Sequence, residues 1–245
     1  MKKFLGFVTI ISLALNSQAQ TPAATEKIKK DWSKVSLSNR PNDHLMIQLG
    51  YDFWANKPDS IRTKGLSRSL NVYFLFDFPF KTDPRWSIGI GAGIGSSHIF
   101  FDKIKVDINA LTNDLNFPDV ADTSHFKKYK LSSVYAEAPV ELRFCANPEN
   151  SNKSWKGAVG IKVGTMLSAY TKGKNLQNSA GQDENPYVEK LRNKRYFNST
   201  RFCLTGRIGF GNISLFGQYQ VTTQIRDGLG PDVHPVSVGL TLSGL

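Results

Sequence analysis

The chain has 245 residues, and its 31 Lys and Arg against 20 Asp and Glu give a formal net charge of +11. Hydrophobic residues make up 40% of the chain, which excludes a disordered composition. Two cysteines exclude a disulfide-stapled scaffold and a structural zinc cluster, and we expect no metal and no cofactor. A basic soluble protein that binds nucleic acid is the first interpretation, and the residue pattern argues against it.

The first residues have the pattern of an export signal. Two lysines precede an apolar stretch, Phe4–Leu15, whose length is typical of a secretory signal. Ser17 and Ala19 place small residues just before a cleavage point. We expect a signal peptide over residues 1–19 and, because the next segment is polar and basic, a periplasmic tether over residues 20–43. An exported protein does not meet genomic DNA, so no nucleic-acid partner is expected.

From residue 44 onward, apolar and polar residues alternate with the period of β-strands. The alternating runs cover residues 45–53, 70–78, 86–95, 134–144, 155–169, 201–210, 212–221 and 236–243. One face of these runs is free of charge and aromatic, as at Phe74, Phe76 and Phe78, whereas the other is rich in Gly and Ser and carries charges. An apolar face this broad suits lipid, and a face of small residues suits the crowded interior of a narrow barrel.

Long and short connections alternate between the runs. The long connections are residues 54–66, 102–128, 171–200 and 222–235, and the short ones are 79–85, 145–154 and Gly211–Asn212. Outer-membrane barrels have this asymmetry, with long extracellular loops and short periplasmic turns. We therefore predict an all-β fold, an eight-stranded antiparallel up-and-down transmembrane β-barrel over residues 44–245, in the outer membrane of a Gram-negative bacterium. A soluble sandwich or a lipocalin-like barrel is the alternative. Because proline lacks a ladder donor, a bulge is expected at Pro139.

One strand carries a resemblance to a known family. The segment Tyr135-Ala-Glu-Ala-Pro-Val-Glu-Leu-Arg-Phe144 resembles the tyrosine–x–glutamate–x–proline signature of the PorT-like, porin-family outer-membrane β-barrel proteins of Bacteroidetes-type bacteria. The Gly-rich third run and the closing segment 237–242 fit the same family, and the resemblance covers about residues 44–245. It implies the barrel architecture and contact with the outer-membrane assembly machinery. Because PorT is tied to type IX secretion and gliding, it also implies a non-enzymatic envelope protein with a structural, assembly or secretion-associated partner.

The charged residues of the polar face are expected inside the barrel. The interior of an eight-stranded barrel is just wide enough for side chains to fill it, so we expect a paired charge network that plugs it. The predicted network comprises Asp52, Asp77, Glu137, Glu141, Arg143, Lys162 and Arg207. A buried charge without its partner is costly, so Arg143→Ala is expected to destabilise the barrel. A narrow pore for ions or small solutes is the alternative.

We expect no catalytic site in this chain. His98 and Asp102 form the best available dyad, but no nucleophile at useful spacing accompanies them. A hydrolase or acyltransferase site at the rim is therefore the weakest alternative.

The connection 171–200 is crowded with basic residues. Lys190, Arg192, Lys194 and Arg195 are expected to lie outside the strands, where they would contact lipopolysaccharide phosphates or a protein partner. Outer-membrane lipid and lipopolysaccharide are thus expected partners.

The two cysteines are expected at opposite ends of the barrel. Cys145 follows the periplasmic end of one run, and Cys203 lies near the extracellular end of another. They should then be about 20 Å apart, whereas a disulfide needs Cα atoms within about 7 Å. We predict two free thiols, with Cys203 pointing into the lumen and Cys145 at a periplasmic turn.

Overall fold

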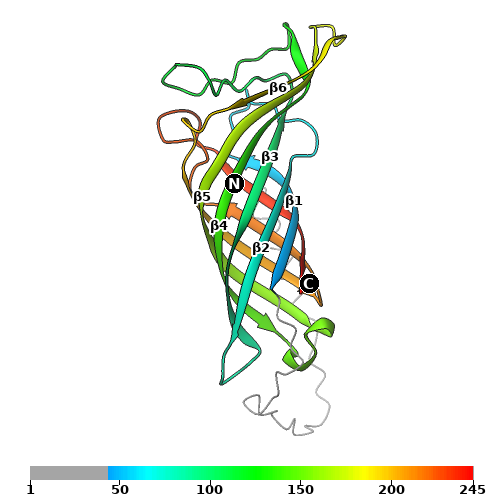
Figure 1. The fold of residues 1–245 in the computed structure, drawn as a ribbon, viewed down its shortest axis with the longest axis vertical. Helices are drawn as coiled ribbons and strands as arrows, with labels where there is room; N and C mark the ends of the chain where they lie inside the picture. Colours follow the sequence, from blue (N-terminus) through cyan, green and yellow to red (C-terminus); the bar gives the residue numbers. More distant parts are fainter. Residues whose placement is uncertain (1–43, 245) are drawn as a thin grey trace, which may run out of the picture. The chain divides into compact units, whose positions relative to one another are not determined.

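The structure, a computed structural model, describes residues 44–244 of the chain (Figure 1). The predicted signal peptide, residues 1–19, and the predicted tether, residues 20–43, lie outside the described residues. Within residues 44–244, none of the helical segments has the length and apolar character needed to cross a bilayer.

Antiparallel strands form nearly all of the regular structure in this part of the chain. They are β1 (Leu45–Ala55), β2 (Arg68–Pro79), β3 (Trp86–Phe101), β4 (His125–Cys145), β5 (Trp155–Gln177), β6 (Asp183–Arg192), β7 (Thr200–Phe210), β8 (Ile213–Gln220) and β9 (His234–Ser243). A short 3-10 helix, η2 (Pro148–Lys153), connects β4 to β5.

Eight of the strands described in residues 44–244 close into a ring, as the sequence predicts. Around the ring the order is β1, β2, β3, β4, β5, β7, β8 and β9, and β9 pairs back with β1 from Met46–Ser243 to Ala55–His234. A closed ring leaves no row of unpaired backbone groups, which is what a β-structure needs to stand in hydrocarbon.

The alternation predicted from the sequence separates the two surfaces of the ring. On β2, Phe74, Phe76 and Phe78 are each about half exposed on the outside, whereas Tyr73 and Leu75, which alternate with them, are fully buried inside. The apolar face therefore looks outward, as lipid requires, and the polar face looks into the barrel.

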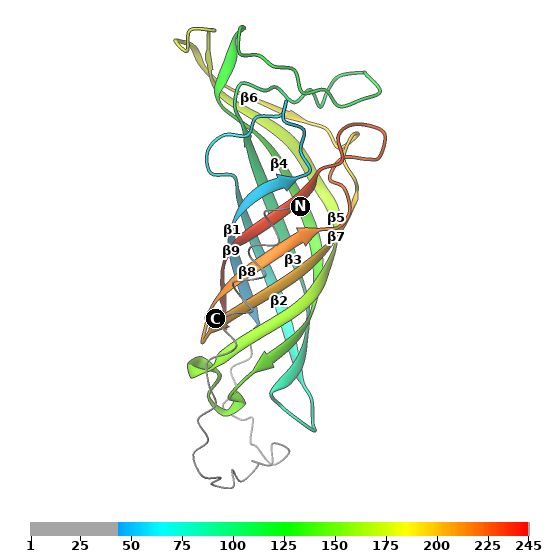
Figure 2. The same cartoon turned by 180° about the vertical axis from the view of Figure 1, so that it is seen from behind.

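The connections alternate in length as predicted. Short turns join β2 to β3, β4 to β5 and β7 to β8 at one end, and the long connections lie at the other end (Figures 1 and 2). Gly211 has a φ of 60° in the two-residue turn between β7 and β8. This left-handed conformation favours glycine.

Two of the predicted long connections are shorter than expected because the strands continue through them. β4 begins at His125 and β5 runs for 23 residues to Gln177, so both rise above the other strands. β6, which the sequence analysis did not predict, pairs with the upper part of β5 and stands outside the ring. The connection 171–200 is therefore mostly a β-hairpin.

The expected bulge at Pro139 is wrong. Pro139 pairs in register with Lys162 on β5, and the register shift between β4 and β5 lies instead at Val134/Tyr135. On the β3 side, the ladder is interrupted without a shift between the Ile90–Val140 and Gly93–Glu137 pairs. The missing proline donor is thus accommodated by a local gap in one ladder.

The shift at Val134/Tyr135 reverses the two faces of β5 above it. Below it, Leu167 is 49% exposed on the outside, as predicted. Above it, Ala169 was expected on the outer face but is completely buried. An extra residue on one strand moves every following side chain to the opposite face.

Candidate functional site: the barrel interior and the extracellular rim

The lower interior holds ion pairs centred on Glu141. The Glu141 carboxylate accepts hydrogen bonds from Arg207 Nη2 at 2.9 Å and from Arg143 Nε at 3.1 Å. Arg143 Nη1 also lies 3.4 Å from Asp77 Oδ1. These four residues come from β2, β4 and β7, so pairs form across the barrel as well as along the wall.

Glycines on β3 make room for the two buried charges of β4. A Cβ on Gly89 would stand 2.5 Å from Arg143 Nε, and a Cβ on Gly95 would stand 2.9 Å from the Glu137 carboxylate. Real Cβ atoms do not approach other atoms so closely, because such contacts overlap van der Waals radii. Gly89 and Gly95 therefore leave room for the large side chains of β4, whereas Gly91 and Gly93 lie against Leu75 and Tyr73 of β2.

A second group of interior charges lies higher in the barrel, around Glu137. Arg201 Nη1 lies 2.8 Å from Glu137 Oε1, and the Tyr73 hydroxyl donates to Glu137 Oε2. The Arg201 guanidinium also stands over the Tyr135 ring, 4.9 Å from its centroid. Arg201 and Glu137 are 4% and 3% exposed, so this pair is desolvated.

Lys162 lies next to this group and is 1% exposed. Its Nζ donates to Gln48 Oε1 at 2.7 Å, to Gln218 Oε1 at 2.9 Å and to the Tyr73 hydroxyl at 3.2 Å. An ammonium has three donors, and here each has an acceptor from a different strand.

Six of the seven predicted network residues lie in these two interior groups, and Asp52 lies apart from both. Asp52 is buried, but its carboxylate accepts a hydrogen bond from Ser97 Oγ and forms no ion pair within residues 44–244. Arg201 is not among the seven residues of the predicted network. Its signal was present, because Arg201 occupies a polar-face position on the same run as Arg207.

The upper interior is apolar, which the sequence analysis did not predict. We call this group of buried residues the upper cluster. Its members are Trp54, Ile61, Ile99, Phe101, Ile104, Val106, Ile108, Leu115, Tyr129, Leu131, Tyr135, Met166, Ala169, Tyr196, Phe197, Ile225 and Val233. The alternation of Ile104, Val106 and Ile108 within a supposed loop was the signal for it.

All four long connections contribute to the upper cluster and are bonded to one another. The Tyr196 hydroxyl donates to the carbonyl oxygens of Ala110 at 2.6 Å and Thr112 at 2.9 Å. The Leu115 amide donates to the Leu229 carbonyl at 2.7 Å. The connections are thus packed together above the charged layer rather than splayed into solvent.

The basic residues predicted outside the strands are divided by the fold. Lys190 and Arg192 lie on β6 itself, which corrects the expectation that they are loop residues. Lys194 Nζ turns back to the Met166 carbonyl at 3.5 Å, and the Arg195 guanidinium stands over the Tyr196 ring. The four residues therefore do not form one cluster.

The candidate dyad of His98 and Asp102 is not brought together. His98 Nδ1 forms a hydrogen bond with Ser132 Oγ at 2.8 Å, whereas Asp102 pairs with Lys64 Nζ at 3.1 Å. Within residues 44–244, no group of three or more His, Cys, Asp and Glu side chains is placed to hold a metal ion.

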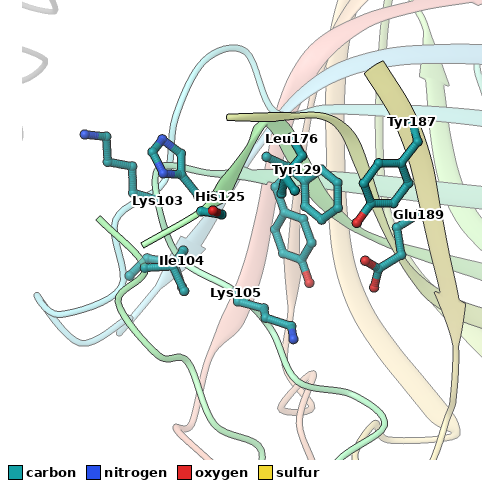
Figure 3. A pocket seen from close by; sticks show the side chains of 11 residues that line it. Lys103, Ile104, Lys105, His125, Tyr129, Leu176, Tyr187 and Glu189 are labelled. Carbon is teal, nitrogen blue, oxygen red and sulfur yellow. The ribbon is translucent and has the colours of Figure 1, made fainter. Parts of the chain in front are cut away.

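A small hollow opens between the 102–124 connection and the β5–β6 hairpin (Figure 3). Tyr129 and Leu176 line its back, and His125 lies across from Tyr187 and Glu189. The hollow encloses about 170 Å³. Ligand pockets usually enclose about 300–1,000 Å³, so we assign no ligand to it.

The exposed ion pairs of the rim tie its connections to one another. Arg62 Nη2 pairs with Asp119 Oδ1 at 2.7 Å, joining the 56–67 and 102–124 connections. The hydrogen bond from the Arg62 side chain lowers the pKa of the Asp119 carboxyl below its usual value. Both side chains are about half exposed, so solvent screens this pair strongly.

Comparison with known proteins gives a family and similarity to solved structures. The family model described as "Outer membrane protein beta-barrel domain" matches residues 39–226. The crystal structure of Ail, the attachment invasion locus protein of Yersinia pestis, is similar at 14% sequence identity, over 82% of this chain and 97% of that chain, with a TM-score of 0.34. So low a TM-score supports no conclusion about this chain. A search of curated proteins found no match.

Proposed function

Because the chain belongs to the outer membrane protein β-barrel domain family and is located in the outer membrane of a Gram-negative bacterium, we propose that it is a non-conducting, non-enzymatic barrel that presents its extracellular rim to a partner. The finer assignment within the family is PorT-like. The partner is then a component of envelope assembly or of secretion.

The main support for the proposal that the barrel does not conduct is the burial of Lys162. A lysine that lines a water-filled pore keeps its ammonium hydrated, whereas Lys162 is 1% exposed and donates all three of its hydrogens to protein oxygens. Above it, the upper cluster packs against the strands with Tyr196 and Phe197 fully buried. A polar layer and an apolar layer therefore lie in series along the barrel axis.

Conductance in planar lipid bilayers tests this proposal. The purified barrel, inserted at low protein density in 1 M salt, is expected to give no unitary current steps above those of a protein-free bilayer. Circular dichroism and heat-dependent mobility in SDS gels, measured on the same preparation, establish that the barrel is folded. Reproducible current steps from folded protein would support the narrow pore instead.

The PorT-like assignment rests on the resemblance of segment 135–144 to the tyrosine–x–glutamate–x–proline signature. Tyr135 and Glu137, from the tyrosine–x–glutamate–x–proline segment, both contact Arg201 inside the barrel. Deleting the gene in its own host is expected to impair protein secretion or gliding, and complementation should restore it. Normal secretion and gliding in the deletion strain would remove the PorT-like role and leave the barrel unaffected.

The absence of enzymatic activity is part of the same proposal. His125 Nδ1 is engaged by the Thr123 carbonyl, and His234 Nδ1 by the Gln220 carbonyl. His98 Nδ1 is engaged by Ser132 Oγ at 2.8 Å and not by a carboxylate. We expect neither ester hydrolysis nor acyl transfer when the folded barrel is incubated with a phospholipid or a p-nitrophenyl ester.

A further inference from the structure

Basic residues are aligned on the outer surface of the barrel just above its apolar belt. Lys130 on β4 pairs directly with Lys172 on β5, and Lys172 pairs directly with Lys190 on β6. One step higher, Lys128 pairs with Lys174. We call Arg68, Lys128, Lys130, Lys172, Lys174, Lys190 and Arg192 the outer basic face.

These side chains point away from the barrel interior. Lys130 and Lys172 are flanked along their strands by Leu131 and Thr171, which are 1% and 2% exposed and lie inside. Successive side chains of a strand point to opposite faces, so the lysines lie on the outer surface. The reversal of β5 at Val134/Tyr135 is what places Lys172 and Lys174 there.

The height of the outer basic face is set by the apolar belt below it. On β2 the exposed apolar residues run from Phe78 to Leu70, and Arg68 is the next outward residue. A strand crosses the hydrocarbon core in about 9–11 residues, so Arg68 stands where the outer leaflet becomes polar. The strands that carry the lysines continue upward past this level (Figure 1).

The protein itself does not neutralise these charges. Within residues 44–244, none of the seven residues forms an ion pair, although Lys64 and Lys127 close by are paired with Asp102 and Asp183. Lys190 and Lys130 make cation–π contacts instead. Lys190 Nζ lies 4.4 Å from the centroid of the Tyr170 ring, and Lys130 Nζ lies 5.7 Å from the centroid of the Phe100 ring. Like charges directly opposite on neighbouring strands repel one another. An anion that lies against this row of three lysines would relieve their repulsion.

Two hollows with apolar walls adjoin the outer basic face. The lower encloses about 570 Å³ and is lined by Leu49, Leu70 and Lys130 among others. The upper encloses about 300 Å³ and is lined by Phe100 and Lys128 among others. Leu66 and Arg68 line both, so the two hollows are contiguous. Apolar walls below and ammonium groups above match a molecule with acyl chains and phosphates.

We infer that the outer basic face binds the phosphate groups of an acylated, phosphorylated glycolipid of the lipid A type, whose acyl chains lie in the hollow beside Leu49 and Leu70. Charge-assisted contacts from lysine and arginine to phosphate supply the attraction, and the low dielectric constant near the lipid headgroups strengthens it. The inference shares with the proposed function only the orientation that places the long connections outside. It requires neither a closed lumen nor a secretion partner.

The test compares two triple variants of the full chain in detergent micelles. Lys130→Gln with Lys172→Gln and Lys190→Gln removes the central row. Lys103→Gln with Lys105→Gln and Lys153→Gln removes the same charge from exposed positions elsewhere. Native mass spectrometry at rising concentrations of diphosphoryl lipid A gives the dissociation constant. The row variant is expected to bind about tenfold more weakly or worse, and the control variant like the wild type.

Further probes distinguish the source of the phosphate and the state of the fold. Monophosphoryl lipid A should bind the wild type more weakly than the diphosphoryl form, and millimolar inorganic phosphate should not displace it. In lipid-free detergent the row variant should melt no lower than the wild type, because a repulsive row has been removed. Equal binding by wild type and row variant, or displacement by inorganic phosphate, would overturn the inference. Conductance is measured separately, so either idea can fail alone.

Discussion

Arg201 supplies the positive charge that compensates the buried Glu137 carboxylate. We expect Arg201→Ala to lower the free energy of unfolding by about 3–5 kcal/mol, because it leaves a buried carboxylate without its ion pair. Urea titration followed by tryptophan fluorescence in detergent measures the loss. Arg195→Ala, which removes an exposed guanidinium from the connection just before β7, should change stability by no more than about 0.5 kcal/mol.

A second variant separates the pair from the bulk of the arginine side chain. Arg201→Met combined with Glu137→Gln removes both charges at once and should recover much of the lost stability. If Arg201→Ala and Arg195→Ala proved equally mild, the ion pair would contribute nothing measurable.

The side of the barrel on which each charge lies could be predicted from the sequence, and the charge's partner could not. Alternation assigns Glu137, Glu141 and Arg207 to the interior because it depends only on neighbouring residues. The contact of Arg201 with Glu137 crosses from β7 to β4, which are not adjacent strands, and joins residues 64 positions apart. Such residues come together only when the ring closes, so a pattern of neighbouring residues in the sequence does not predict their contact.

The two cysteines provide a residue-scale test of the strand order. Both are free and buried; Cys145 pairs with Lys156 and Cys203 with Lys162, which places them about 20 Å apart along β5. Neither thiol should react with a maleimide in the folded barrel, because they are only 5% and 0% exposed. Both should react after boiling in SDS without reductant, as counted by mass spectrometry. An intact bridge between them would contradict the strand order.

At the scale of the element, β3 is shaped by its neighbour. Gly95→Ala should lower the free energy of unfolding by about 1–3 kcal/mol, because the new methyl group would press on the Glu137 carboxylate and its pair with Arg201. Gly217→Ala on β8 is the matched control, since nothing lies within 4 Å of its Cβ position. Thermal melts of the two variants in one detergent make the comparison. A control that melted lower than Gly95→Ala would show that space beside β4 is not what these glycines provide.

The elements above the membrane were the hardest to predict. In β5, the register shift turns the polar residues Lys172 and Lys174 outward, so a strand continues through a segment with no apolar outer face. Periodicity identifies a strand by the contrast between lipid and interior, and this contrast ends where the lipid ends. The sequence therefore predicts a loop where the β5–β6 hairpin lies, although the two strands pair from Tyr170–Arg192 to Gln177–Asp183, with two register shifts near the tip.

At the scale of the whole molecule, the polar and apolar layers should act as independent barriers. Phe197→Ala removes a fully buried ring of the upper cluster and should cost about 3–5 kcal/mol of stability. Planar-bilayer recordings of the folded variant should nevertheless show no current steps, because the Lys162 layer below is untouched. Current steps from this variant alone would mean that the upper cluster is the sole barrier.

Because its strands differ in length, the barrel is asymmetric around its axis. β5 has 23 residues and β8 only eight, whereas about 9–11 suffice to cross the hydrocarbon. The extra residues of β4 and β5, together with β6, extend above the membrane, whereas the β8 side does not (Figures 1 and 2). A neighbouring protein that diffuses in the membrane meets long strands on one side of the barrel and short strands on the opposite side. The height of protein that a laterally diffusing neighbour would meet therefore depends on the side from which it approaches.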